Sequence, residues 1–213
     1  MSAPAALRID AFIEGFSESA LGAWREAEPW SVTASAPEIL RRLLETLTNE
    51  DFRIDGEVAV HRSSSVETGA TLKGPCIVGA ETFVARGAYL RGGVWIDSGC
   101  VVGPGVEVKS SFVFAATTLA HFNFVGDSLI GRGANLEAGS IIANCRNERP
   151  DRRVAVRIGS QLHRLPVEKF GALVGDGTRI GANAVVAPGA LLPPGSQIDR
   201  LQLFDEERRL SPL

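Results

Sequence analysis

The sequence is poor in the residues that carry disulfide, redox and metal chemistry. It contains three cysteines and three histidines in 213 residues. Because the cysteines are odd in number and widely separated, we do not expect a disulfide framework. Cys76 and Cys100 each stand four places after an aliphatic member of the repeat described below, where a small buried side chain fits. We therefore expect these two cysteines to be packing thiols and the protein to lie in the reducing environment of the cytoplasm.

Other absences exclude classes of partner. No apolar run approaches the length that crosses a membrane, and Met1–Asp10 lacks the basic start and apolar core of a signal peptide. The net charge is −3 with both signs mixed, so nothing attracts nucleic acid or an anionic membrane electrostatically. We expect neither as a partner.

What the sequence does contain is a six-residue period. Every sixth residue from Ile54 to Val108 is Ile, Leu or Val. Such a short fixed period indicates a parallel β-solenoid in which each repeat forms one edge of a coil. Three edges make a triangular coil of about 18 residues, so residues one coil apart stack at roughly 4.8 Å. The members are Ile54, Val60, Val66, Leu72, Val78, Val84, Leu90, Ile96, Val102 and Val108.

The period is interrupted twice further along the chain. It continues through Phe114 and Ala120 and then slips. It breaks again over residues 143–172, a stretch rich in Arg, Asn and Asp. We therefore expect a β-helix over residues 54–198 with a loop insertion at 143–172, where function is often carried, and a polar tail over 199–213. The later members are Phe124, Ile130, Leu136 and Ile142, then Val174, Ile180, Val186, Leu192 and Ile198.

Residues 1–53 have no such period. The run Ser35–Glu38 matches a capping box, and five aliphatic residues follow it on one helical face. An earlier stretch, Asp10–Trp24, is a second candidate helix. A solenoid exposes unpaired strand edges at its ends, so we expect a partly helical cap over the first coil, with a separate binding function as the alternative.

Three cations recur once per predicted coil, each directly after a repeat aliphatic: Lys73, Arg91 and Lys109. Stacked on one corner, they would repel one another unless an anion or carboxylates intervened. This pattern fits a phosphate site. It fits equally a solvated ladder balanced by acids such as Glu107.

His121 lies close to the slip in the period. A neutral histidine there could act as a general base toward an amine or hydroxyl, although it could also be a structural residue of a bulge. Asn135 and Asn144 follow, and asparagine suits sugar hydroxyls as well as tight turns. The spacings between His61, His121 and His163 do not fit a three-histidine zinc site, so we expect no metal.

Several of these residues occur in an order that resembles one known family. It is the acetyltransferase half of the bifunctional glucosamine-1-phosphate N-acetyltransferase / N-acetylglucosamine-1-phosphate uridyltransferases, especially the archaeal-type sugar-1-phosphate enzymes. From Arg91 to Asn144 the match needs no gaps, and it extends to about Ile198. The matching segments are Arg91, Glu107–Lys109, His121–Asp127, Asn135–Gly139, Asn144, Lys169–Phe170 and Gly175–Asp176.

The resemblance implies a left-handed β-helix, a homotrimer, and active sites in grooves between subunits. It implies that His121 deprotonates the amine of the sugar and that no metal is required. The sugar phosphate would be bound by Arg91, Lys109 and Lys169, and the sugar positioned by Glu107, Asn135 and Asn144. Main chain near Ala138 and Ala182 would contact the acetyl-CoA arm.

The chain also departs from the family pattern. Phe124 stands where the family has a tyrosine, and Cys145 where its bacterial branch has another. Residues 1–53 are too short for the nucleotidyltransferase half and contain no glycine-rich phosphate loop, so we do not expect uridyl transfer.

The expected function is therefore N-acetyl transfer from acetyl-CoA to an amino-sugar phosphate, such as glucosamine-1-phosphate or a related nucleotide-sugar precursor. Two alternatives remain. One is a non-catalytic trimer that binds sugar phosphates or serves as a scaffold, and the other is an O-acetyltransferase of the same fold.

Overall fold

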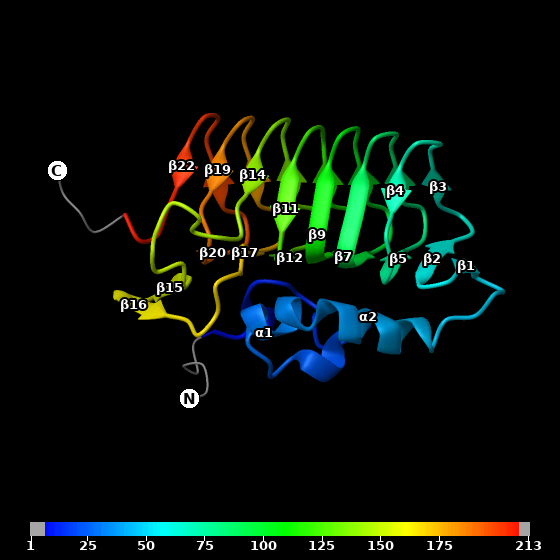
Figure 1. The fold of residues 1–213 in the computed structure, drawn as a ribbon, viewed down its shortest axis with the longest axis horizontal. Helices are drawn as coiled ribbons and strands as arrows, with labels where there is room; N and C mark the ends of the chain where they lie inside the picture. Colours follow the sequence, from blue (N-terminus) through cyan, green and yellow to red (C-terminus); the bar gives the residue numbers. More distant parts are fainter. Residues whose placement is uncertain (1–6, 209–213) are drawn as a thin grey trace.

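Strands stacked one above another dominate the structure, a computed structural model that describes residues 7–208. They wind as a left-handed parallel β-helix of about eight turns, which confirms the expected fold (Figure 1). The register is parallel and advances by three complete repeats per coil in the first coils, since Leu72 pairs with Leu90 and Val84 with Val102. The six-residue period therefore predicted the architecture correctly.

The coil has three faces. Face 1 consists of β3 (Ser65–Val66), β6 (Phe83–Val84), β8 (Val101–Val102), β10 (Thr118–Leu119), β13 (Asn135–Leu136), β18 (Arg179–Ile180) and β21 (Gln197–Ile198). Face 2 consists of β4 (Thr71–Leu72), the first parts of β7 (Tyr89–Ile96) and β9 (Glu107–Val113), β11 (Phe124–Gly126), β14 (Ile141–Ile142), β19 (Val185–Val186) and β22 (Leu203–Phe204). Face 3 consists of β2 (Val58–His61), β5 (Cys76–Val78), the last parts of β7 and β9, β12 (Leu129–Ile130), β17 (Ala172–Val174) and β20 (Ala190–Leu192).

The interior of the coil is filled by the repeat aliphatics. From Val78 to Val108 each member of the series is buried in one continuous core. The later series from Val174 to Ile198 fills the same core, as expected. Cys76 and Cys100 are buried there as free thiols, and burial raises the pKa of each to about 12. They are packing residues, as the sequence predicted.

The slip in the period lies elsewhere than predicted. Arg91 pairs with Lys109, but Val94 pairs with Ser111, so the second strand has one residue fewer at this corner. The next coil is consequently shorter by that residue, and on face 1 Val102 pairs with Leu119. The slip therefore lies at the corner between faces 2 and 3, and not beside His121.

Because of this deletion, three predicted core residues do not face the interior. Val113, Leu119 and Val125 fill the core in place of their neighbours Phe114, Ala120 and Phe124. The sequence does not reveal which residue of each pair faces inward, because both residues are apolar.

The two ends of the coil also differ from the six-residue series. Ile54 belongs to β1 (Phe52–Asp55), which pairs antiparallel with β2, and its side chain is 36% exposed. At the other end, β22 pairs in register with β19, which buries Phe204. Regular coil thus extends from β2 to β22.

The N-terminal segment covers the outer surface of face 3. It contains η1 (Ile9–Ala11), η2 (Gly22–Trp24), α1 (Pro29–Ala34) and α2 (Ala36–Leu44), which lie beneath the coil in Figure 1. Phe16 and Leu40 of this segment are buried against the outward side chains of face 3, such as Trp95. Gly93 at the corner has φ +88°, and a Cβ there would meet Pro37 of α2 at 2.7 Å, so only glycine permits this approach. The segment lies along the side of the coil and not over its first turn.

Two helix expectations are only partly confirmed. The predicted helix after Ser35 exists as α2, but the Ser35 side chain makes no capping hydrogen bond. The stretch Asp10–Trp24 contains only the two 3-10 turns η1 and η2 with hydrogen-bonded turns between them. Its apolar residues are buried by the fold, which holds the segment without a regular helix.

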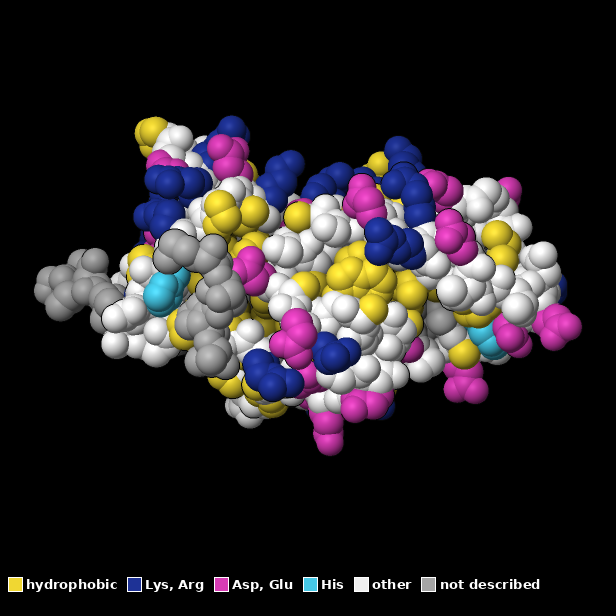
Figure 2. Space-filling view, turned by 90° about the horizontal axis from the view of Figure 1, so that it is seen from below, with side chains coloured by type: hydrophobic (Ala, Val, Ile, Leu, Met, Phe, Trp, Pro, Cys, Tyr) yellow, Lys and Arg dark blue, Asp and Glu magenta, His cyan; other side chains and the backbone are white. Residues whose placement is uncertain are grey.

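The insertion contains an antiparallel hairpin, β15 (Ala155–Ile158) and β16 (Gln161–Arg164). Val154, Val156 and Leu165 extend the apolar cluster that covers face 3. Figure 2 shows Lys and Arg side chains gathered at the end of the molecule that carries this hairpin. Several arginines of the insertion pair with carboxylates of the segment that follows β22. The pairs include Arg146–Asp205, Arg149–Glu207 and Arg157–Glu206.

Candidate functional site

Three polar side chains meet at the corner between faces 2 and 3. The Lys109 ammonium lies 2.8 and 3.0 Å from the two carboxylate oxygens of Asp127. The Asn144 amide donates a hydrogen bond to the same carboxylate. Asp127 is only 5% exposed, whereas Lys109 and Asn144 are half-buried. Lys109 and Asn144 were both predicted to bind the sugar-phosphate acceptor. The structure brings them together through Asp127, to which the sequence analysis assigned no role.

The insertion returns to the coil at this same corner. The Phe170 N–H donates to the Asn144 carbonyl at 3.1 Å, and the Gly171 N–H donates to the Asp127 carbonyl at 2.9 Å. A Cβ on Gly171 would meet the Gly126 carbonyl oxygen at 2.1 Å, so this strand can approach only as glycine. Lys169, directly before these residues, is exposed beside the cluster. Its side chain makes no ion pair within residues 7–208.

The predicted stack of cations is present and is balanced by carboxylates. Arg91 donates through Nε to Glu107 at 2.8 Å and also lies 5.7 Å from the ring centroid of Tyr89. The Lys73 ammonium lies 5.2 Å from the centroid of the same ring. Because Glu107 pairs with Arg91 and Asp127 with Lys109, the stack carries little net charge beyond Lys73. This matches the charge-balanced ladder that the sequence left open, and it leaves hydrogen-bonding groups at the corner.

His121 lies at a different corner, between faces 1 and 2. Its side chain is exposed and makes no hydrogen bond to the described residues. His121 precedes β11, whereas Asp127 directly follows it. Within one chain, the histidine and the corner cluster of Lys109, Asp127 and Asn144 therefore lie at opposite ends of face 2.

Residues of successive coils stack beneath His121 on its own corner. The Gly139 N–H donates to the His121 carbonyl at 2.8 Å, and the Asn183 N–H donates to the Ala138 carbonyl at 2.9 Å. Ala182, which precedes Asn183, donates its own N–H to a side-chain oxygen of Glu137 at 3.0 Å. The corner thus aligns His121 with the segments around Ala138 and Ala182, which the resemblance connects with the acyl donor.

Asn135 lies on face 1, apart from the other predicted sugar-binding residues. It pairs with Arg179 of the next coil and lines an open hollow of about 340 Å³. Glu137 and Arg200 border this hollow and form a two-pronged pair with N–O distances of 2.9 Å. The hydrogen bond from Arg200, followed by that from the Ala182 N–H, holds the pKa of Glu137 below its ordinary value.

The two departures from the family pattern both flank the corner cluster of Lys109, Asp127 and Asn144. Phe124 is half-buried, and a Cβ added to Gly126 would lie 2.9 Å from its ring and 2.8 Å from the Asn144 amide. The ring and the amide therefore share the space above Gly126. Cys145, next to Asn144, is a half-buried free thiol.

The three histidines lie apart from one another in the fold: His61 in β2, His121 at the corner and His163 in β16. Across residues 7–208, no three His, Cys, Asp or Glu side chains lie close enough to hold a metal ion. In the same part of the chain, none of the helices has the length and apolarity of a membrane span.

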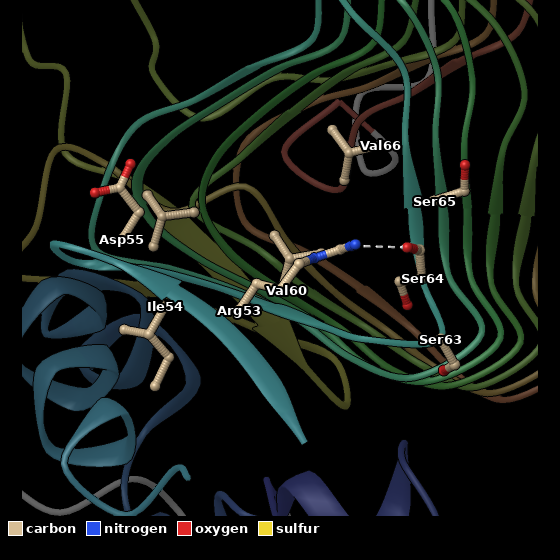
Figure 3. A pocket seen from close by; sticks show the side chains of 9 residues that line it. Arg53, Ile54, Asp55, Val60, Ser63, Ser64, Ser65 and Val66 are labelled. Carbon is tan, nitrogen blue, oxygen red and sulfur yellow. Dashed lines mark hydrogen bonds between the residues drawn. The ribbon is translucent and has the colours of Figure 1, made fainter. Parts of the chain in front are cut away.

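A larger hollow, of about 510 Å³, lies at the open first turn of the coil (Figure 3). Val58, Val60 and Val66 line it, and Arg53 reaches across to donate to the Ser64 carbonyl at 3.0 Å. None of the predicted site residues lines this hollow.

The residue that sequence reasoning missed is Asp127. Asp127 stands three complete repeats after Lys109, so the period predicts that the two side chains stack directly. An acid at that spacing from a cation indicates an ion pair between neighbouring coils. The signal is weakened because the shortened coil places Gly126 opposite Lys109 and Asp127 at the corner beyond.

Comparison with known proteins identifies relatives for most of the chain, although no protein-family model matches it. The bifunctional sugar-1-phosphate nucleotidylyltransferase/acetyltransferase of Sulfurisphaera tokodaii is 27% identical over 84% of this chain and 47% of its own length. The bifunctional protein GlmU of Methanococcus vannielii is 28% identical over 87% of this chain and 45% of its own length. YaiX, an uncharacterized acetyltransferase of Escherichia coli, is 24% identical over 89% of this chain and 86% of its own length.

The chain thus spans about half the length of the two bifunctional relatives. The matched half is their C-terminal acetyltransferase part. Over most of its length, the chain is similar to the acetyltransferase part of GlmU-type bifunctional enzymes.

Proposed function

We propose that the protein transfers an acetyl group from acetyl-CoA to the amine of an amino-sugar phosphate. The names of the relatives support this reaction class, since they include sugar-1-phosphate nucleotidylyltransferase/acetyltransferases. The observation that supports it most is the corner cluster of Lys109, Asp127 and Asn144, flanked by Arg91 and Lys169. Together these residues offer charged and amide donors suited to a phosphate and to sugar hydroxyls.

In the proposed mechanism, the neutral amine attacks the thioester carbonyl directly. A C–N bond forms, the C–S bond breaks, and CoA leaves as the thiolate, which then takes a proton from protonated His121 or from solvent. His121 takes the proton that the amine loses. Its ring can accept this proton because it is exposed and has no hydrogen-bond partner among the described residues. A backbone N–H on the corner that carries Ala138 and Ala182 would stabilise the oxyanion. No metal or covalent enzyme intermediate is needed.

The positions of these groups favour an active site shared between chains. His121 and the Lys109 cluster lie at opposite ends of face 2 of the same chain, with the strand β11 between them. A homotrimer would place the histidine of one chain beside the cluster of its neighbour. We propose this assembly, with Asn135 and Lys169 contributed to the same grooves. With all three of its thiols unpaired, the protein would operate in the cytoplasm.

The test is release of CoA thiol from acetyl-CoA, measured with glucosamine-1-phosphate, glucosamine, N-acetylglucosamine-1-phosphate and a plain sugar. We expect turnover with the first acceptor, weaker turnover with the second and none with the others. Turnover with N-acetylglucosamine-1-phosphate, whose amine is blocked, would instead indicate O-acetylation. Binding of glucosamine-1-phosphate without thiol release would indicate a non-catalytic binding protein.

A further inference from the structure

Asp127 lies where three distant segments of the chain meet. Its carboxylate accepts from Lys109 of β9 and from Asn144 at the start of the insertion. Its carbonyl accepts the Gly171 N–H at 2.9 Å, two residues after Lys169 at the end of the insertion. Two residues of the proposed acceptor site, Lys109 and Asn144, therefore meet at this side chain, and its backbone holds the strand that follows Lys169.

The local backbone shows that this arrangement is built into the fold. Asp127 has φ +47° at the shortened corner, a conformation that L side chains adopt rarely and that aspartate tolerates. The corner is followed by buried Ser128, whose N–H is held by the Ser111 hydroxyl at 3.0 Å. A carboxylate as buried as that of Asp127 is stable only when it is paired and hydrogen-bonded. Lys109 and Asn144 meet that requirement, so all three side chains depend on one another.

We propose that Asp127 is a positioning residue of the acceptor site, an inference that rests on the proposed function. It acts through its two partners and does not touch the acceptor. It fixes the Lys109 ammonium in one place and orients the Asn144 amide so that the carbonyl oxygen of that amide faces away from the carboxylate. Without the carboxylate, the amide is free to turn and Lys109 loses its anchor.

The first experiment compares acceptor and donor kinetics in Asp127→Asn. We expect KM for glucosamine-1-phosphate to rise about tenfold or more, because a charge-assisted contact has been lost, while KM for acetyl-CoA changes less than twofold. The matched control is Asp176→Asn. Asp176 also accepts hydrogen bonds across the fold, from the N–H groups of Glu14 and Arg132, but it lies away from the corner. The Asp176→Asn variant should have a lower free energy of unfolding but an unchanged KM for glucosamine-1-phosphate.

A double variant separates positioning from general support of the fold. If Asp127 acts through Lys109, adding Asp127→Asn to Lys109→Met should change the acceptor KM much less than it does alone. Additive effects on the acceptor KM, or an equal rise in both KM values, would overturn the proposal. If Asp127→Asn does not fold, Asp127→Glu keeps the charge but moves it by one methylene. An acceptor KM unchanged in that variant would equally overturn the inference.

A spectroscopic measurement judges the inference even if the proposed function fails. The side-chain amide resonances of Asn144 can be assigned by their loss in Asn144→Asp. They should shift in Asp127→Asn and stay in place in Asp176→Asn. If the wild type acetylates no amino sugar but the Asn144 resonances shift, the function is wrong and Asp127 still orients that amide. If the resonances do not move, Asp127 does not position Asn144.

Discussion

The guanidinium of Arg146 makes two hydrogen bonds, of 2.8 and 2.7 Å, to the carboxylate of Asp205, 59 residues further along the chain. Both side chains are only 3% exposed. Arg146 lies two residues after Asn144, and Asp205 directly follows the last strand of the coil. The pair therefore fastens the start of the insertion to the end of the β-helix.

Breaking this pair should destabilise the protein strongly. Asp205→Asn removes the charge that makes both short hydrogen bonds to this buried guanidinium and leaves only Glu207 at 3.3 Å and Glu148 at 3.8 Å as ion-pair partners. Removing one partner of a buried pair typically costs about 3–5 kcal/mol. We expect a loss of this order in the free energy of unfolding, measured by urea titration at neutral pH. Asp151→Asn removes the exposed pair with Arg153 and should change the free energy of unfolding far less. Equal stability of the two variants would show that the buried pair contributes nothing.

The same pair predicts a loss of stability in acid. Burial alone would raise the pKa of Asp205, but the hydrogen bonds and the charge of Arg146 outweigh it and lower that pKa below its ordinary value. The unfolded chain has the ordinary value, about 3.9, so the contribution is fully present above that pH. It is lost as the pH falls through the lower folded value. Urea titrations between pH 7 and pH 2 should show a smaller decrease for Asp205→Asn than for the wild type.

The sequence predicted most of the coil because its interior admits only apolar side chains at a fixed spacing. It failed at the shortened corner because Phe114 and Val113 are equally apolar, so the pattern could not show which one faces inward. Phe114 is instead buried on the outer side, against Phe16 of the N-terminal segment. The residue missing at the corner turns Val113 inward, and Phe114 is left to pack against the N-terminal segment.

The candidate site was predictable in its members but not in its arrangement. Lys109 and Asn144 were singled out by their order along the chain, yet their joint contact with Asp127 depends on the shortened coil. Arg146 and Asp205 gave no signal, since charged residues in loops are usually solvated. The pair between Arg146 and Asp205 becomes evident only in the folded structure, where the start of the insertion lies beside the end of the β-helix.

The proposed assembly predicts the mass in solution. Light scattering at micromolar concentration should give three times the chain mass of 22.6 kDa. Phe122 and Leu201 protrude at the corner of His121, 70% and 79% exposed in the single chain. Exposed apolar side chains of this size are typical of protein contacts. The mass of a single chain would remove the shared active site.

The cation stack predicts a phosphate-dependent effect. If Arg91 contacts the acceptor phosphate in addition to Glu107, Arg91→Ala should raise KM for glucosamine-1-phosphate by about 10- to 150-fold. The effect on unphosphorylated glucosamine should be several times smaller. Arg132→Ala, which removes an exposed arginine from another corner, is the control. Equal effects on both acceptors would mean that Arg91 only balances the charge of Glu107.

The reaction itself depends most directly on His121. His121→Ala should fold, keep its assembly and bind acetyl-CoA, because the exposed ring makes no hydrogen bond to any described residue. It should lose acetyl transfer by about 10²- to 10⁴-fold, the usual contribution of a general base. His163→Ala in the hairpin is the matched control and should remain active. Full activity of His121→Ala on a substrate that the wild type acetylates would show that another group, or water, takes the proton from the amine.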